Sequence, residues 1–431
     1  MGAQEKLNEL RTLKKSYSDL ADNVIPISDL AIEVQKGKES LVDAVKAKGG
    51  NSSADKSLSE IADDVRNISN IDKTFSNVDF FMAQYGLSMS PLQLIYKHFD
   101  TEYPTYVCYV VDAGTKINVQ RSAYVMFTAD GAIDNPEGEY IIPEWENRFG
   151  YFIFAYKSDA VTWENFDAYF IGMYGATTTL DNRTMSKICG VECDNCNITL
   201  GDSCFASRVL DFTLFNNSNV NTNGGGQYYN TTITKISLPQ ITSIASQMFY
   251  QCKAKIISLP NAISFAASQG FCNSSVLKID LSALKSIGTQ TLYLQSTLTE
   301  LYLPECTSID GSEALRGLTS LKKLYAPKCK TFLSSGIQGL YNAPNLDDIT
   351  LGEVSSSIKM SSWSPANLTD EAKAAKIDKT IREGIANRIQ DRTDLSALTI
   401  TFSQAVRDIL TTETEEAFAA KNWNIAPAKS V

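Results

Sequence analysis

Residues 233–252, ITKISLPQITSIASQMFYQC, and residues 298–318, LTELYLPECTSIDGSEALRGL, decide the fold because they are two copies of one pattern. In each copy three apolar residues stand at intervals of three and two, and a proline directly follows the third. The positions two and five residues before this third residue, the anchor, are apolar in all seven copies. The anchors are spaced by 24, 21, 22, 22, 23 and 25 residues: Leu214, Leu238, Leu259, Leu281, Leu303, Ala326 and Leu351.

This internal repeat predicts a leucine-rich repeat solenoid over residues 181–357. A period of 20–25 residues with this spacing gives one short strand, a turn and an irregular return, and no repeat buries its apolar face alone. Proline lacks an amide donor and therefore ends a strand, as expected directly after four anchors, at Pro239, Pro260, Pro304 and Pro327. Seven stacked turns at about 4.8 Å each would make a rod about 35 Å long.

Residues 358–431 are expected to cap the solenoid. The repeat fails after Ser357, and Thr369 is predicted to cap a helix with four isoleucines on one side, Ile377, Ile381, Ile385 and Ile389. A last repeat then returns as LTITF and the short helix SQAVRDIL, with apolar positions Leu395, Leu398, Ile400 and Val406. Such a cap keeps the open edge of the solenoid from pairing with other chains.

Residues 1–70 are helical by pattern and are expected to fasten the chain to other chains. Leu7, Leu10 and Leu13 begin a narrow apolar face. After Gly49-Gly50, Ser57 and Glu60 have the spacing of a capping box. The short helix that follows is marginal alone, so its stripe, Leu58, Ile61, Val65 and Ile68, must be covered. We favour sister chains in a homotrimer, and packing on the chain's own next domain is the alternative.

Residues 71–180 change to short β-rich runs, of which TYVCYVV (105–111) and YFIFAY (151–156) are the longest. Turn chemistry separates the runs, for example Asp130-Gly131 and Asn135-Pro136. This spacing, dense in tyrosine and phenylalanine, predicts a small β-sandwich of its own. The predicted fold class is therefore a multidomain α+β protein, with a helical or coiled-coil oligomerisation region, a β-sandwich, and a leucine-rich repeat solenoid with a helical cap.

Charge and hydropathy exclude several classes of partner. The formal net charge is −10, and 39 lysines and arginines are spread thinly, so we expect no nucleic acid. No run of about 18 apolar residues occurs, which argues against membrane insertion, and the first residues do not resemble a secretory signal. Nine cysteines without a disulfide framework indicate reduced thiols. The single histidine, His98, is interpreted as a partly buried structural residue.

One cysteine cluster invites a metal hypothesis. Cys189, Cys193, Cys196 and Cys204 lie within sixteen residues, so a tetrathiolate zinc site is conceivable. Their spacing lacks the paired C-x2-C units of such sites, and buried repeat-core thiols are the favoured interpretation. No metal, cofactor or catalytic residue is assigned.

Carboxylates and aromatic residues offer two further readings. Glu144 and Glu146 could flank a sugar bond as in a glycosidase, although carboxylates at i and i+2 of a strand simply share a solvent face. Trp145, Trp163, Tyr151, Tyr156 and Tyr169 could stack sugars but are better read as core. Tyr302 and Tyr325 stand just before an anchor and point away from the inward set. They are the candidate ligand surface.

Two resemblances bear on function. The repeat units resemble the BspA-like leucine-rich repeat family, whose members are mostly bacterial surface or secreted adhesion proteins. The stretch ending in SLSEIADDVRNI is similar to short modules of tail-fibre, head-fibre and baseplate proteins of tailed bacteriophages, and the closing segment from LTITF resembles the ends of phage-encoded repeat proteins. This second resemblance implies a virion protein with other virion proteins as partners.

The sequence thus favours a structural virion protein, a head or tail fibre or decoration component. It would dock through residues 1–70 and present its repeats to a host-surface glycan or protein. A bacterial cell-surface adhesin is the first alternative, and a glycan-degrading enzyme is the second.

Overall fold

The computed structural model describes residues 78–120, 123–159, 166–181, 187–335 and 338–430. These residues belong to one compact unit that spans residues 71–431. The helices predicted over residues 1–70 lie outside the described residues, and so do the predicted interface positions Leu7, Leu10, Leu13, Leu58, Ile61, Val65 and Ile68.

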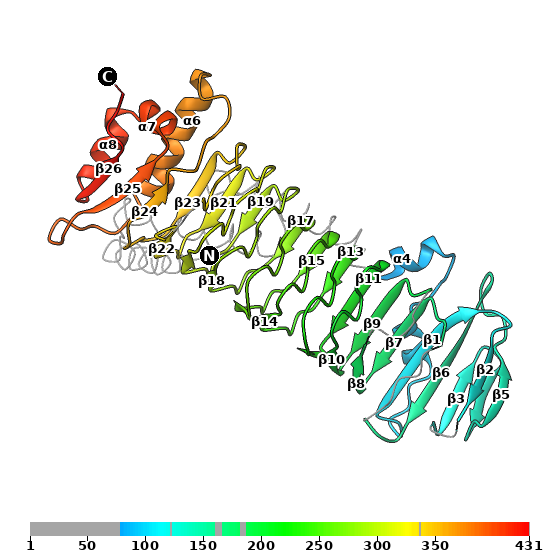
Figure 1. Cartoon of the computed structure of the whole chain (residues 1–431). Coiled ribbons are helices and arrows are strands. Elements are labelled where there is room, and N and C mark those ends of the chain that lie inside the picture. The colour runs from blue at the N-terminus through cyan, green and yellow to red at the C-terminus, as the bar shows by residue number, and fades with distance from the viewer. Residues whose placement is uncertain (1–77, 121–122, 160–165, 182–186, 336–337, 431) are drawn as a thin grey trace, which may run out of the picture. The chain divides into compact units, whose positions relative to one another are not determined.

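A ten-stranded sheet runs along much of this unit, in the order β17-β15-β13-β11-β9-β7-β1-β6-β3-β4 (Figure 1). Neighbouring strands from β7 to β17 are parallel, whereas β1, β6, β3 and β4 are joined by antiparallel pairs and β1 also pairs antiparallel with β7. The bounds are β1 Thr105–Asp112, β3 Val125–Thr128, β4 Gly131–Asp134, β6 Phe149–Tyr156, β7 Phe170–Tyr174, β9 Gly190–Asp194, β11 Val209–Asn216, β13 Thr232–Ser237, β15 Lys253–Ser258 and β17 Ser275–Asp280.

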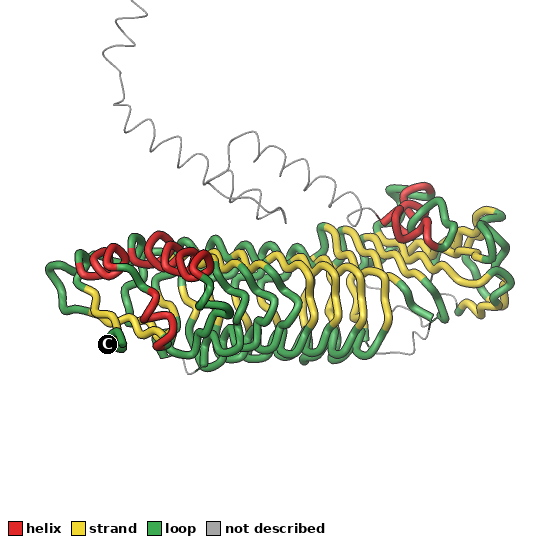
Figure 2. The backbone as a smooth tube through the Cα atoms, turned by 90° about the horizontal axis from the view of Figure 1, so that it is seen from above, coloured by secondary structure: helices red, strands yellow, loops and turns green. Residues whose placement is uncertain are grey.

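The remaining strands build the rest of the turns, which Figure 2 shows stacked side by side. A further parallel sheet holds β19 Glu300–Tyr302, β21 Lys323–Ala326 and β23 Asp348–Leu351. Short return strands pair in parallel on the opposite side of each turn: β8 Thr177–Leu180, β10 Asn197–Leu200 and β12 Asn219–Thr222; β14 Ser243–Ile244 and β16 Ser264–Phe265; β18 Ser286–Ile287, β20 Ser308–Ile309 and β22 Thr331–Phe332. A small antiparallel pair joins β2 Lys116–Val119 to β5 Gly138–Ile141.

One continuous apolar core fills the space between sheet strands and return strands. The predicted register is confirmed from the second anchor onward: Ile236 pairs with Ile257, and Leu301 pairs with Leu324. The apolar position six residues after the anchor lies on the return strands, where Ile287 pairs with Ile309. Each turn therefore buries both of its strands against the turn before and the turn after, as a leucine-rich repeat requires.

The first anchor, Leu214, is wrong by one residue. Thr213 pairs with Ile236 and Leu214 with Ser237, so Phe215 takes the place that Leu238 holds one turn later. Phe215 is buried in the repeat core, whereas Phe212 and Leu214 belong to a second core on the other face of the sheet. Because β11 is covered on both faces, apolar spacing alone could not identify its inward side.

The prediction of a separate β-sandwich over residues 71–180 is also wrong. Most of the predicted strands form, but β1, β3, β6 and β7 belong to the same sheet as the repeats. Strand β7 pairs in parallel with β9, as the sheet strands of the later turns pair with one another. The solenoid therefore begins at Phe170, and the predicted boundary at residue 180 falls inside a continuous structure.

Two short helices, α4 Val78–Gln84 and α5 Pro91–Lys97, cover the second face of the sheet at this end. The ring of Phe81 on α4 packs on Phe212, 5.1 Å between centroids. Helix α5 begins with a capping box between Ser90 and Gln93. It lies so close to β7 that a Cβ on Gly172 would stand 2.5 Å from the Cβ of Pro91.

The C-terminal cap forms as predicted, with one correction. Helix α6, Glu371–Ile381, is capped by Asp370, whose carboxylate accepts from the Lys373 amide at 2.8 Å, and not by Thr369. A π-helical turn, Arg382–Ala386, follows. The four isoleucines at spacing four are all buried. The returning repeat is confirmed: it forms β25 Leu398–Phe402 and α7 Gln404–Ile409. Strand β25 lies in a parallel sheet between β24 Ile358–Met360 and β26 Trp423–Ala426. Helix α8, Thr412–Ala419, lies between α7 and β26 in the chain.

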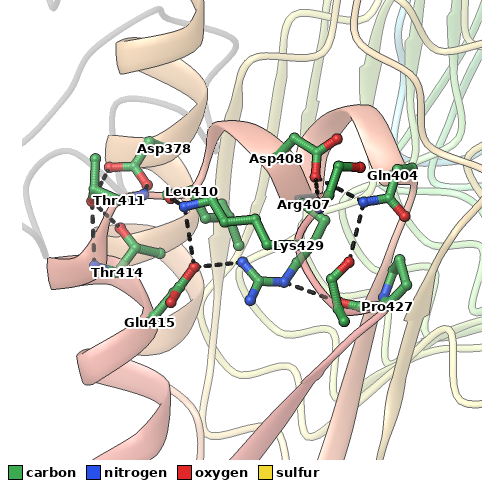
Figure 3. Close-up of polar contacts among 12 residues, drawn as sticks. Asp378, Gln404, Arg407, Asp408, Leu410, Thr411, Thr414, Glu415, Pro427 and Lys429 are labelled. Carbon is green, nitrogen blue, oxygen red and sulfur yellow. Dashed lines mark hydrogen bonds and ion pairs between the residues drawn. The ribbon is translucent and has the colours of Figure 1, made fainter.

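Polar contacts close this cap (Figure 3). The buried carboxylate of Asp378 accepts from both the backbone amide and the hydroxyl of Thr411, each at 2.9 Å. Arg407 pairs with Glu415 at 2.5 Å and donates to the carbonyl oxygen of Pro427 at 3.0 Å. These contacts tie α6, α7, α8 and the residues after β26 into one block over the last repeat.

Candidate functional site

Between its return strand and the next sheet strand, each turn passes a corner with two residues in the left-handed conformation. The first, with φ between 53° and 66°, is Gly226, Gln247, Gln269, Gln290, Glu313 or Gln338 in successive turns. The second, with φ between 51° and 77°, is Asn230, Gln251, Asn273, Leu294, Gly317 or Asn342. Backbone hydrogen bonds link the corners, for example Asn230 N to Tyr250 O at 2.9 Å and Gly317 N to Tyr341 O at 2.8 Å. Consecutive corners therefore stand in fixed register.

A line of planar side chains follows from this register, because the residue just before the second left-handed position is exposed or partly exposed in all of these turns but one. We call this line the tyrosine edge: Tyr229, Tyr250, Tyr293, Arg316 and Tyr341. The rings of Tyr229 and Tyr250 are parallel, with centroids 5.4 Å apart and planes inclined by 2°. The Arg316 guanidinium lies over Tyr293 at 5.5 Å and over Tyr341 at 5.0 Å. The turn between Tyr250 and Tyr293 contributes the buried Cys272 instead.

Amide side chains form a second line beside the tyrosine edge. Gln247 donates to Gln269 at 3.0 Å, Gln269 donates to Gln290 at 3.2 Å, and Gln290 donates to Glu313 at 2.7 Å. The hydrogen bond from Gln290, followed by the contact with Arg316, lowers the pKa of the Glu313 carboxyl. This amide ladder crosses four turns and gives the corner a polar border.

The predicted ligand residues Tyr302 and Tyr325 are brought together on the sheet strands β19 and β21. Their rings stack, with centroids 5.0 Å apart and planes inclined by 14°, and both side chains are partly buried. An ion pair between Lys323 and Asp348, at 3.0 Å, joins β21, which also carries Tyr325, to the next sheet strand, β23. The structure thus places the two predicted residues side by side. The binding of a ligand to them stays a prediction.

Sequence reasoning missed the tyrosine edge because the alignment followed the strands alone. The signal was present as doublets in which a core residue precedes an exposed or partly exposed ring: Tyr228-Tyr229, Phe249-Tyr250, Leu292-Tyr293 and Leu340-Tyr341. The first member of each doublet is buried. Extending the alignment to the corner, about twelve residues beyond each anchor, would have revealed the line.

The cysteines behave mainly as core residues. Cys193, Cys196 and Cys204 are buried in the repeat core, as favoured from the sequence, whereas Cys189 packs against the second core on the opposite face of the sheet. No group of three or more possible metal ligands occurs in the part of the chain that the structure describes. Burial raises the pKa of the Cys193 thiol well above its ordinary value, so this thiol stays protonated.

The other sequence candidates take structural places. Glu146 accepts from the backbone amide of Ser88 at 2.6 Å and so fixes the segment between α4 and α5. His98 is partly buried, as expected; its ring stacks on Phe127 with centroids 4.9 Å apart, and its Nε2 lies 3.2 Å from the Tyr151 hydroxyl. Burial is the main cause that lowers the pKa of His98.

The aromatic residues considered as a sugar platform in residues 71–180 pack as core where they are described. Tyr151 and Tyr156 are buried, and Trp145 and Tyr169 pack against the second core. Trp163 lies outside the described residues. Within the described ranges, no helix has both the length and the apolar character needed to cross a membrane.

In comparisons with known proteins, one family model matches part of the chain. Residues 221–339 match the family model described as "BspA type Leucine rich repeat region", in six copies. No curated protein and no solved structure matches the chain. The matched residues contain the amide ladder, the pair Tyr302 and Tyr325, and the tyrosine edge up to Arg316, whereas Tyr341 follows two residues after the match ends. Residues 221–339 are therefore similar to BspA-type leucine-rich repeat regions, and repeats of this type suggest a surface adhesion or binding protein.

Proposed function

We propose that this protein is an adhesion protein of a virion, a head or tail fibre or decoration component that presents its repeats to a host surface. The observation that carries the adhesive part is the tyrosine edge, a line of planar side chains held in register along the repeats, which is exposed at its two end rings and partly exposed between them. Exposed aromatic residues on a solenoid are suited to recognition, because the scaffold fixes their spacing without moving on binding.

The virion part of the proposal rests on the N-terminal sequence. The stripe Leu58, Ile61, Val65 and Ile68 follows a capping box and resembles phage structural modules. In this proposal residues 1–70 form a homotrimer and dock on other virion proteins. Three identical arms then gain avidity, since one bound arm raises the effective concentration of ligand at the next.

Sedimentation with particles tests the virion assignment. Lysates of infected or induced host cells are separated by density, and the protein is located with an antibody against its repeats. We expect it in the fraction that holds assembled particles. Recovery only in the bacterial envelope fraction would favour the cell-surface adhesin instead.

The mass of the full chain in solution tests the oligomer. We expect a trimer for the native sequence and a monomer for the double variant Ile61→Asp/Val65→Asp, since two charges on the stripe would oppose helix packing. Asp63→Ala/Asp64→Ala, on the predicted polar side of the same helix, is the matched control and should remain trimeric. A monomeric native chain would refute the trimer.

The proposal includes no catalytic step. Incubation of the protein with host-surface polysaccharide should release no new reducing ends. Release that disappears in Glu144→Gln or Glu146→Gln would contradict the proposal and favour a glycan-degrading enzyme.

A further inference from the structure

The tyrosine edge ends in two rings that each have one covered face. At one end Tyr250 covers a face of Tyr229, and 38% of the Tyr229 side chain stays exposed. At the other end the guanidinium of Arg316 covers a face of Tyr341, which is 48% exposed. Five turn-to-turn steps of about 4.8 Å place these two rings about 24 Å apart along the solenoid. Each end therefore offers a ring that is braced on one side and open to a ligand.

Uncharged hydrogen-bonding side chains flank both rings. Asn230 follows Tyr229, and Asn342 follows Tyr341, each exposed at a left-handed corner. Gln338 precedes Tyr341 in its turn and accepts from Arg316 at 2.7 Å. A carboxamide offers two donors and one acceptor oxygen, so it can bind a hydroxyl group in either direction.

A polar hollow lies where the chain continues after the second ring. It has a volume of 350 Å³ and begins at Pro344, three residues after Tyr341. Asn345 and Asn367 line it together with the beginning of α6, where Asp370 stands. The lining also includes Lys373, so the hollow offers amide, carboxylate and ammonium groups at the end of the repeats.

This combination selects among ligand classes. Nucleic-acid bases also stack on tyrosine, but they need a positively charged groove, and this chain has a net charge of −10. A protein-binding hot spot needs an apolar centre that is sealed from water, whereas these rings stand in single file between amides. A pyranose ring combines an apolar face of C–H groups, which packs on an aromatic face, with hydroxyl groups at its rim, which bind amides.

We infer that the tyrosine edge is a carbohydrate-binding site, at which pyranose rings of a surface glycan stack on the open faces of Tyr229 and Tyr341. The flanking asparagine and glutamine side chains bind the sugar hydroxyls, and a glycan that spans both rings engages the two ends together. This inference rests on the proposed adhesive function and assigns its ligand class and residues.

Binding of the full chain to a printed array of neutral and acidic pyranose oligosaccharides tests the inference, followed by calorimetric titration of the oligosaccharide that binds best. Tyr229→Ala and Tyr341→Ala should each weaken binding about tenfold, because each removes one stacking face. Tyr229→Phe and Tyr341→Phe keep the ring and should bind within about twofold of the native chain. Unfolding midpoints of all four variants check that the solenoid is intact.

Three results would overturn the inference. Unchanged binding by the double variant Tyr229→Ala/Tyr341→Ala would place the glycan elsewhere. Loss of binding in Tyr302→Ala/Tyr325→Ala alone would place it on the sheet strands. Attachment to host cells that survives periodate oxidation of their glycans but not protease treatment would make the ligand a protein, in which case the proposed adhesion stands and only the carbohydrate inference fails. A chain that binds neither cells nor sugars would refute the adhesive function itself.

Discussion

The N-terminal strands and the strands of the later repeats differ in what covers them. In the N-terminal part, β6 is buried along its whole length and β1 at all but its last residue, because the repeat core lies on one face and α4 with α5 on the other. In the repeats, β21 and β23 alternate between buried and partly exposed residues. A strand covered on both faces reads as a continuous apolar run, and a strand covered on one face reads as an alternation.

The difference separates a structural end from a recognition surface. The side chains of the covered strands are buried on both faces of the sheet. The N-terminal end therefore closes the solenoid and leaves few side chains for a ligand to contact. Open strands and corners leave one side chain in two to meet solvent, and the tyrosine edge and the pair Tyr302 and Tyr325 both occur in this open part. Recognition is therefore expected where the outer face carries no helix.

The largest expected effect comes from removing a ring from the covered face. Phe81 on α4 is 1% exposed and packs on Phe212. Phe81→Ala should lower the free energy of unfolding by about 3–5 kcal/mol, because it leaves a cavity between the helix and the sheet. Urea unfolding of the full chain measures this.

Leu277 on β17, on the open part of the sheet and 52% exposed, is the matched control. Leu277→Ala should change stability by no more than about 0.5 kcal/mol. Equal effects of the two substitutions would mean that α4 does not cover the sheet in solution.

The same comparison explains what the sequence could and could not predict. The repeats from Leu238 onward were predictable because their strands are covered on one face, so that apolar spacing identifies the inward side. At β11, apolar residues on both faces left two possible registers, and the alignment chose Leu214 instead of Phe215. On the helix-covered face, Glu192 of β9 pairs with Leu214 on one side and with Gly172 of β7 on the other. No leucine pattern therefore marks the turns of β7 and β9 as repeats.

The candidate site was predictable only in part, for a related reason. Tyr302 and Tyr325 stand at a fixed offset from the anchors, so alternation along a strand identifies them as outward. The tyrosine edge depends on corners where the backbone is left-handed, and residues as different as Asn273, Leu294 and Gly317 take that place. Side-chain type at such a corner does not report its conformation.

The second-largest expected effect is a dependence of stability on pH, which we attribute to a carboxyl group buried beneath α5. Glu192 on β9 is buried, and the amide of Leu92 donates to its carboxylate at 3.2 Å. Burial is the main cause that raises the pKa of Glu192 from 4.5 to about 7, and the nearby Asp79 and Asp194 raise it further. The folded state therefore binds this proton more tightly than the unfolded state does. Its contribution to stability is full below about pH 4.5 and is lost as the pH rises through about 7.

Glu192→Gln tests this assignment. The amide keeps an acceptor for Leu92 but cannot ionise, so the variant should lack this fall, which amounts to about 3 kcal/mol. Unfolding midpoints are compared between pH 4.5 and pH 8 for both chains. Parallel pH profiles would show that Glu192 does not titrate in this range.

The third effect contrasts the apolar N-terminal cover with the polar C-terminal cap. Asp378 is buried and accepts two hydrogen bonds from Thr411. Asp378→Ala should cost about 1–3 kcal/mol, because it leaves the donors of Thr411 without their acceptor. Lys379→Ala, at the next residue of α6 and exposed, should have little effect. A loss equal in both variants would assign the stability of the cap to α6 as a whole and not to this contact.

The smallest effect concerns the corners that carry the tyrosine edge. Leu294 has φ +58°, a conformation that disfavours leucine and suits asparagine, which occupies the equivalent place one turn earlier at Asn273. Leu294→Asn should therefore raise the free energy of unfolding by about 0.5 kcal/mol, a small gain because Leu294 also packs closely over Gly317. The reverse exchange, Asn273→Leu, should cost more than this, since it adds strain and also removes the hydrogen bond from Asn273 to the Tyr250 hydroxyl at 3.3 Å. Opposite signs in thermal unfolding would show that corner conformation sets stability here, whereas two destabilising exchanges would mean that packing of Leu294 outweighs its backbone strain.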